Sequence, residues 1–230
     1  MRQGRSRHAW MAGAMAISVA ACGAHEAPAS DASEGAEEPV GDAARPSYTV
    51  RLDSESSDPS LYRVVEDDDG IRVETGPAGI AYRDDDVVRA GDFLAQATFV
   101  LYGAPLGYRE AYGIFVGGLD LEEPDQEYTY LLIRSTGDFL VKRRIGEITE
   151  TIVDWTPHEA VAGVAADGDA PSNTLAVEVV GPETRFVVNG VAVHTAPTTR
   201  VRPHGIAGVR VNHRLDVRVD DWTLDQRTGS

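Results

Sequence analysis

The stretch Thr184-Arg-Phe-Val-Val-Asn-Gly-Val-Ala-Val-His194 is the clearest local indication of the fold. Asn189 and Gly190 both tolerate a positive φ, which a two-residue type I′ turn requires at its two central positions. The flanking residues are rich in β-branched and aromatic side chains, which favour strands. The stretch therefore predicts an antiparallel hairpin with strands at Thr184–Val188 and Val191–His194.

Similar short runs recur along most of the chain, with turn sequences such as Asp69-Gly70 and Gly181-Pro182 between them. Their apolar spacing is short and close to period two, and no long helical repeat follows residue 22. We therefore predict an all-β domain over residues 47–226, a two-sheet antiparallel jelly-roll sandwich, with a short tail at 227–230. The predicted strands include Tyr48–Leu52, Phe93–Leu101, Tyr128–Arg134, Phe139–Arg143, Thr174–Val180 and Leu215–Val219.

Several blocks follow one another in a defined order, among them Tyr112-Gly-Ile-Phe-Val116, Phe186-Val-Val-Asn-Gly190 and Val217-Arg-Val-Asp-Asp-Trp-Thr-Leu224. Together they resemble the concanavalin A-like jelly-roll superfamily, and within it the laminin-G-like and 3-keto-disaccharide hydrolase-like domains of bacterial exported proteins. The resemblance implies that the hairpin and the last strand are architectural, so Trp222 is expected to be buried. Because this fold hosts lectins, glucanases, adhesion modules and spacers, it leaves the function open.

The N-terminus carries three arginines among its first seven residues, then a short apolar run that ends in Val19-Ala-Ala-Cys22. The run is too short to span a bilayer, which takes about 20 apolar residues, and a cleaved export signal fits better. Residues 1–21 resemble a bacterial lipoprotein signal peptide. The resemblance implies cleavage before Cys22, lipidation of Cys22 with a thioether-linked diacylglycerol and an amide-linked acyl chain such as palmitate, and a membrane anchor in the cell envelope. Gly23 after the cysteine points to the outer membrane.

The alternative to a lipoprotein signal is an ordinary signal peptide, with Cys22 as a free thiol that carries no lipid.

Residues 22–46 are expected to hold the lipidated cysteine and a disordered linker, because Gly23–Pro46 is rich in Ala, Glu, Pro, Gly, Ser and Asp and contains no aromatic residue. A docked N-terminal arm is the alternative for this segment. Since Cys22 is the only cysteine, disulfides and zinc–thiolate sites are excluded once it is lipidated.

The formal net charge of the chain is −16, with 37 acidic and 21 basic residues. Removal of the three signal arginines would take it to −19. Nucleic acid is excluded as a partner, because its binding relies on cationic groups that neutralise phosphates. The membrane, through the Cys22 lipid, and carbohydrate remain as expected partners, and the oligomeric state is left open.

A loop with three tyrosines and an arginine is the candidate ligand site: Tyr102, Tyr108, Arg109 and Tyr112. Aromatic faces with a few polar groups suit sugar rings. Packing at strand edges is the alternative role for these tyrosines.

Runs of acidic residues suggest a bound calcium ion as a cofactor, because calcium takes six to eight oxygen ligands. The candidate ligands are Asp84, Asp85, Asp86, Asp120, Glu122 and Asp125. None of the runs has the spacing of an EF-hand, so solvated acidic loops are the alternative. His158, His194, His204 and His213 show no metal-binding spacing.

No catalytic residues are assigned. The retaining glucanases of this superfamily place two carboxylates about 5–5.5 Å apart, and Gly118 stands where the nucleophile would lie in the best-matching stretch, Gly118–Glu123. We therefore expect a lipid-anchored envelope protein with a non-catalytic carbohydrate- or ligand-binding domain. The alternatives are a glycoside-acting hydrolase of the 3-keto-disaccharide hydrolase type and a structural or interaction module of the envelope.

Overall fold

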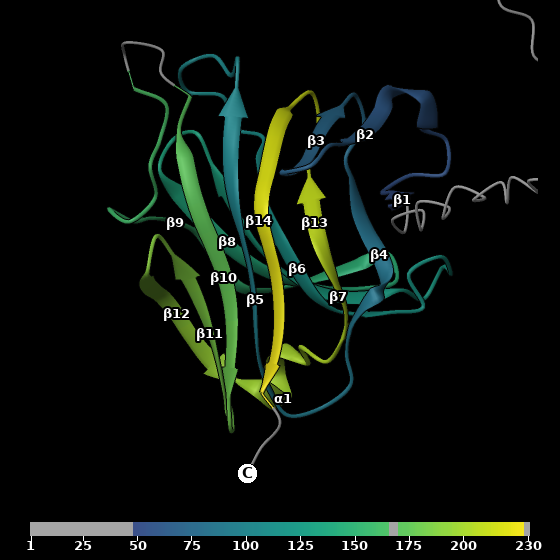
Figure 1. Ribbon diagram of the computed structural model, residues 1–230, viewed down its shortest axis with the longest axis vertical. Coiled ribbons are helices and arrows are strands. Elements are labelled where there is room, and N and C mark those ends of the chain that lie inside the picture. Colours follow the sequence, from purple (N-terminus) through teal and green to yellow (C-terminus); the bar gives the residue numbers. More distant parts are fainter. Residues whose placement is uncertain (1–47, 166–169, 228–230) are drawn as a thin grey trace, which may run out of the picture. The chain divides into compact units, whose positions relative to one another are not determined.

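The computed structural model describes residues 48–165 and 170–227, and these residues form two antiparallel sheets of seven strands each (Figure 1). This confirms the predicted all-β fold class. The first sheet, called sheet A here, contains in spatial order β1 (Thr49–Leu52), β4 (Gly79–Val88), β13 (Gly205–Val211), β6 (Ala111–Leu119), β7 (Glu127–Arg134), β8 (Asp138–Ile145) and β9 (Ile148–Pro157). Sheet B contains β12 (Val191–Pro197), β11 (Glu183–Val188), β10 (Ser172–Val180), β5 (Asp92–Tyr102), β14 (Asp216–Arg227), β3 (Gly70–Thr75) and β2 (Tyr62–Glu66).

The hairpin at Asn189-Gly190 forms as predicted between β11 and β12. Both turn residues have a positive φ, 49° at Asn189 and 80° at Gly190. The Asn189 side chain also donates to the carbonyl of Ala160 at 2.8 Å and to Oδ1 of the buried Asn173 at 2.9 Å. The hairpin is therefore tied to the segment that precedes β10 as well as being closed by its own turn.

The main core lies between the two sheets, and β5 shows how the sequence builds it. Along β5, buried and partly exposed residues alternate, so that Phe93, Phe99 and Leu101 face sheet A. This period of two is expected of a strand with one solvent face. Trp222 on β14 is only partly buried, and it packs against the same core.

A second cluster lies on the opposite face of sheet A, away from the main core. Its members are buried although they point away from sheet B, which explains why β6 is buried along nearly its whole length. The cluster consists of Ile80, Tyr82, Ala111, Phe115, Leu121, Tyr128, Tyr130, Leu132 and Leu140.

Only two short helical turns accompany the strands: η1 (Pro59–Leu61) and α1 (Thr198–Val201) within the described residues. No helix there is long and apolar enough to cross a membrane. Cys22, the signal segment 1–21, the linker up to residue 46 and the last residues of the tail lie outside the described residues, so their predicted roles stay predictions.

Candidate functional site

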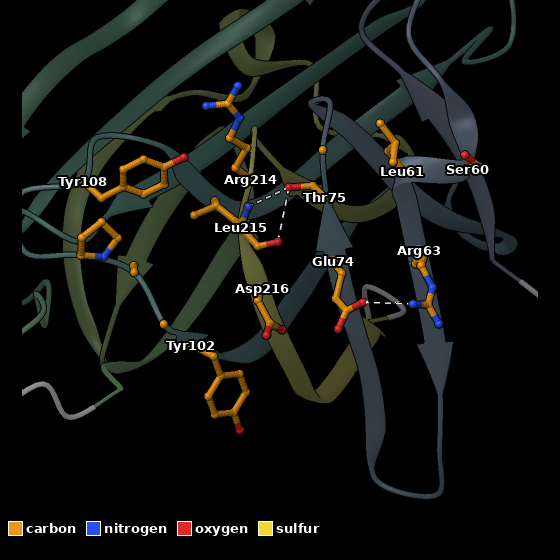
Figure 2. Close-up of a pocket in the computed structure, with 14 residues that line it drawn as sticks. Ser60, Leu61, Arg63, Glu74, Thr75, Tyr102, Tyr108, Arg214, Leu215 and Asp216 are labelled. Carbon is orange, nitrogen blue, oxygen red and sulfur yellow. Dashed lines mark hydrogen bonds and ion pairs between the residues drawn. The ribbon is translucent and has the colours of Figure 1, made fainter.

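An open groove of about 750 Å³ lies at one end of sheet B (Figure 2). It is bordered by η1, the end of β3, the loop between β5 and β6, and the turn between β13 and β14. Its volume is in the range of sites that hold small ligands. The lining residues that matter below are Leu61, Arg63, Glu74, Thr75, Tyr102, Tyr108, Arg214 and Asp216.

The floor of the groove is one row of residues that crosses four neighbouring strands. The register pairs Tyr102 with Asp216, Asp216 with Glu74, and Glu74 with Arg63, on β5, β14, β3 and β2. Residues directly opposite one another in antiparallel strands have Cβ atoms about 4.5–5.5 Å apart. The sheet therefore sets an aromatic ring, two carboxylates and a guanidinium side by side on its solvent face.

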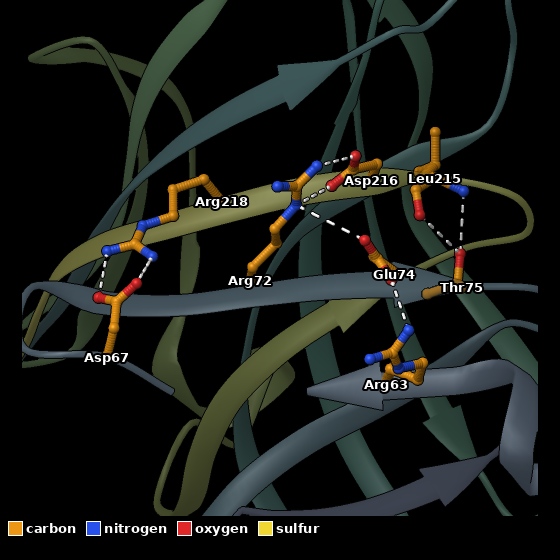
Figure 3. A network of polar contacts seen from close by, with 8 residues as sticks. All are labelled: Arg63, Asp67, Arg72, Glu74, Thr75, Leu215, Asp216 and Arg218. Atoms are coloured by element: carbon orange, nitrogen blue, oxygen red, sulfur yellow. Dashed lines mark hydrogen bonds and ion pairs between the residues drawn. The ribbon is translucent and has the colours of Figure 1, made fainter. Parts of the chain in front are cut away.

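Two carboxylates directly opposite each other would repel, and Arg72 offsets this repulsion (Figure 3). Its guanidinium donates to both carboxylate oxygens of Asp216, at 2.8 and 2.5 Å, and its Nε lies 3.7 Å from Oε1 of Glu74. The hydrogen bond to Asp216 raises the pKa of Arg72. Arg63 approaches Glu74 from the far side, at 3.5 Å. Both carboxylates are thus held by arginines in fixed positions.

Aromatic side chains form the wall on the side of the β5–β6 loop. Tyr102 is 40% exposed, and the guanidinium carbon of Arg72 lies 5.3 Å from the centre of its ring. Tyr108 is partly buried, and its hydroxyl donates to the carbonyl of His213 at 3.3 Å. Ser135 donates to the carbonyl of Tyr108 at 2.5 Å, which fixes the backbone of the loop. This wall is therefore anchored to both the core and the opposite turn.

Thr75 holds the turn between β13 and β14 against the end of β3. Its hydroxyl donates to the carbonyl of Asn212 at 2.5 Å and accepts from the amide of Leu215 at 3.0 Å, while its amide donates to the carbonyl of Leu215 at 2.8 Å. Arg214, in the same turn, has a φ of 53°, a left-handed conformation that costs energy for a residue with a Cβ. The bonds through Thr75 stabilise this turn, and Arg214 is presented at the rim of the groove.

The structure brings together two of the four residues predicted for the ligand site, Tyr102 and Tyr108. Arg109 is exposed and does not line the groove. The prediction for Tyr112 is corrected: its side chain is fully buried, with its ring centre 5.8 Å from that of Phe99, and burial raises the pKa of its hydroxyl. Because β6 already begins at Ala111, Tyr112 faces the core and has a packing role.

The candidate calcium ligands occupy two separate parts of the chain. Asp84 and Asp85 are exposed on β4, and Asp86 is paired with Arg83 at 2.9 Å. The other three, Asp120, Glu122 and Asp125, are exposed in the turn that follows β6. Among residues 48–165 and 170–227, no group of three or more His, Cys, Asp or Glu side chains is placed to hold a metal ion.

The sequence did not predict the charged residues that line the groove, which are Arg63, Glu74, Arg214 and Asp216. Arg72 and Glu74 alternate with the buried Ile71 and Val73, so period-two analysis of β3 could have placed them on a solvent face. Nothing in the sequence indicates that Asp216, far along the chain, pairs with that face. The contribution of Arg214 depends on a turn whose position is set by Thr75, more than a hundred residues earlier.

The aromatic face of sheet A, which carries the second cluster, is closed by its own polar network. The Arg210 guanidinium donates to both oxygens of Asp53, at 2.8 and 2.5 Å, and to the hydroxyl of Tyr128 at 2.9 Å, while Arg144 lies 3.3 Å from Asp53. Burial opposes the ionisation of Asp53, but the hydrogen bonds and charge of Arg210 outweigh it and lower the pKa of this carboxyl. Tyr128 and Tyr130 are only 2% and 6% exposed. Trp155 is partly exposed beside them, and the guanidinium carbon of Arg134 lies 4.2 Å from the centre of its ring, so the described aromatic side chains of this face are buried or covered.

No family model matches the chain, and no curated protein sequence matches it. Its structure is similar to that of a carbohydrate-binding module, CBM66, from Bacillus subtilis, at 8% identity and a TM-score of 0.55, covering 77% of this chain and 95% of that one. It is also similar to the exoplasmic/lumenal domain of VIP36 in a Ca²⁺/Man3GlcNAc-bound form, at 9% identity and a TM-score of 0.55, covering 80% of this chain and 85% of that one. At such identities the likeness establishes the jelly-roll fold alone.

Proposed function

We propose that this chain is a lipid-anchored protein of the bacterial envelope whose jelly-roll domain binds carbohydrate in the groove of sheet B, without catalysis. The observation that carries the binding proposal is the juxtaposition of Tyr102 and Tyr108 with hydrogen-bonding side chains in one open groove. A ring with an exposed face offers apolar contact to a sugar ring, and fixed polar groups beside it orient the hydroxyls. The fold neighbours that bind carbohydrate support the proposal, although the fold does not determine the ligand.

The non-catalytic part of the proposal is supported by the contacts of the two groove carboxylates. A general acid or base must be free to exchange a proton with the substrate. Asp216 instead accepts two hydrogen bonds from Arg72, and Glu74 lies between Arg63 and Arg72. This arrangement suits the accepting of hydrogen bonds from hydroxyl groups.

A glycan panel tests the binding proposal with the purified full-length protein. Tyr102→Ala should weaken binding about tenfold or more, because it removes a large part of the apolar contact. Leu106→Ala is the matched control: Leu106 lies in the same loop and is 72% exposed, but it does not line the groove. Equal affinity of wild type and Tyr102→Ala for every bound glycan would remove the groove as the binding site.

The anchor is proposed on the sequence around Cys22 and tested independently of the groove. Cells that express the protein are fed a labelled fatty acid, and the protein is recovered from the outer and inner membrane fractions. Wild type should carry the label and fractionate with the outer membrane, and Cys22→Ala should do neither. Label of equal intensity in both proteins would overturn the anchor proposal and leave the binding proposal untouched.

A further inference from the structure

The groove and its border carry more positive than negative charge, in a chain with a formal net charge of −16. Arg63 and Arg214 line the groove together with the carboxylates Glu74 and Asp216. Arg72 lies beside the floor, on the same exposed face of β3 as Glu74, and contacts both carboxylates. Both carboxylates are already engaged by Arg63 and Arg72. One guanidinium, that of Arg214, is therefore in excess.

Arg214 is exposed and makes no hydrogen bond, ion pair or ring contact with the rest of the described chain. Arg72, Arg185 and Arg218 on the same sheet each have a carboxylate partner. Among the exposed arginines of the described chain that lack a partner, Arg214 is the one that lines the groove. Arg214 is instead displayed from a turn in a left-handed conformation that three hydrogen bonds of Thr75 support. Figure 2 shows its side chain extending from the Leu215 turn on the side of Tyr108.

We propose that the groove selects acidic glycans, and that Arg214 binds the anionic group of the sugar. This rests on the carbohydrate-binding function proposed above. A guanidinium presents a planar fork of N–H donors that matches the two oxygens of a carboxylate or of a sulfate ester. The sugar ring that carries the anion lies against Tyr108, next to Arg214, and a neighbouring ring lies against Tyr102, where its hydroxyls donate to Asp216 and Glu74.

The charge distribution along the groove also sets the orientation of such a ligand. The carboxylates lie in the middle of the floor, between Tyr102 and Arg63, and their charges are balanced by Arg63 and Arg72. An anion is therefore directed to the rim, where the charge of Arg214 has no partner in the described chain. Neutral hydroxyls, which donate hydrogen bonds, suit the floor. A polymer with one acidic group per sugar or per pair of sugars fits this pattern.

The test uses matched pairs of oligosaccharides and the full-length protein, with affinity measured by calorimetry at low and moderate salt. One pair is an oligogalacturonate and its methyl ester, which has the same skeleton without the charge. The other is a sulfated galactan oligosaccharide and its desulfated form. Wild type should bind at least one acidic member about tenfold more tightly than its neutral partner, and added salt should reduce this preference. The pair that responds identifies carboxylate or sulfate as the group.

Arg214→Gln should remove the preference and leave the affinity for the neutral partner within about threefold. Arg89→Gln, at an exposed arginine that has no hydrogen bond, ion pair or ring contact within the described residues and lies outside the groove, should retain the preference. Thermal unfolding of each variant checks that the fold is intact. Equal binding of acidic and neutral members by wild type, or an unchanged preference in Arg214→Gln, would overturn the inference and leave the carbohydrate function standing. Binding of no glycan at all, charged or neutral, would overturn both.

Discussion

Two arginine–carboxylate pairs in this domain are both bidentate with the same donor–acceptor distances and differ in burial, so they test what burial does to an ion pair. Asp53 accepts from Arg210 at 2.8 and 2.5 Å, and Asp216 accepts from Arg72 at the same two distances. The Arg210 side chain is 8% exposed, however, and that of Arg72 is 47% exposed. Removal of Asp53 leaves Arg210 without its main partner and also takes a carboxylate contact from Arg144, whereas removal of Asp216 leaves Arg72 without its main partner.

Asp53→Ala leaves a buried charge uncompensated and should lower the free energy of unfolding by about 3–5 kcal/mol. Asp216→Ala leaves Arg72 free to bind water and should cost about 0.2–1 kcal/mol. At about 2–4 °C per kcal/mol for a domain of this size, the melting temperature should fall by about 6–20 °C in the first variant and by less than about 4 °C in the second. Urea unfolding at a constant m value gives the free energies directly.

A double variant separates the loss of the pair from the loss of its charge balance. Asp53→Ala with Arg210→Met replaces the buried charge by an apolar side chain of similar length, and it should regain much of the stability lost in Asp53→Ala. Two results would contradict this reasoning. One is an equal loss of unfolding free energy in Asp53→Ala and Asp216→Ala. The other is a double variant that is less stable than Asp53→Ala. Either would show that the burial of Arg210 does not determine the contribution of this ion pair to stability.

Three further predictions concern two glycines with a positive φ, the Asn189 turn and the response to acid. Gly117→Ala should lower the free energy of unfolding by more than about 1 kcal/mol, since Gly117 has a φ of 71° and a Cβ there would meet the Arg202 carbonyl oxygen at 2.1 Å. Gly181→Ala is the control, because Gly181 has a φ of 55° but open space around it, and it should lower the unfolding free energy less in the same urea titration. Asn189→Gly keeps the turn conformation but removes the side-chain bonds to Ala160 and Asn173 and the one accepted from the amide of Thr174, so hydrogen exchange should speed up at the start of β10 while binding is unchanged. Because the folded-state pKa of Asp53 lies below its unfolded value, its contribution is present above about pH 4 and is lost as the pH falls through the folded pKa; the acid limb of stability against pH should therefore be shallower in Asp53→Ala, and identical limbs would contradict the assignment.

The parts of the fold that sequence could predict are those that short-range chemistry determines. The Asn189-Gly190 turn needs only its own two residues, and the alternation in Phe93–Leu101 is visible without knowing what the strand pairs with. Tyr112 is a residue whose burial such short-range patterns do not predict. Whether a tyrosine near a strand end faces the core depends on the residue at which the strand begins, and a shift of one residue reverses the face.

The groove could not be predicted because its parts meet only through strand order. Tyr102 ends β5, Asp216 begins β14 and Glu74 lies near the end of β3, so an antiparallel arrangement of β5, β14 and β3 brings these three positions to one end of sheet B. Each position alone looks like an ordinary exposed residue. The strand register also explains the position of Arg72. It sets the carboxylates of Asp216 and Glu74 opposite each other, which is destabilising. The guanidinium of Arg72, which contacts both, offsets this repulsion. The polar groups of the groove are thus required by the sheet whether or not a ligand binds, whereas the unpaired Arg214 is not, which is why the experiment on acidic glycans is directed at that residue.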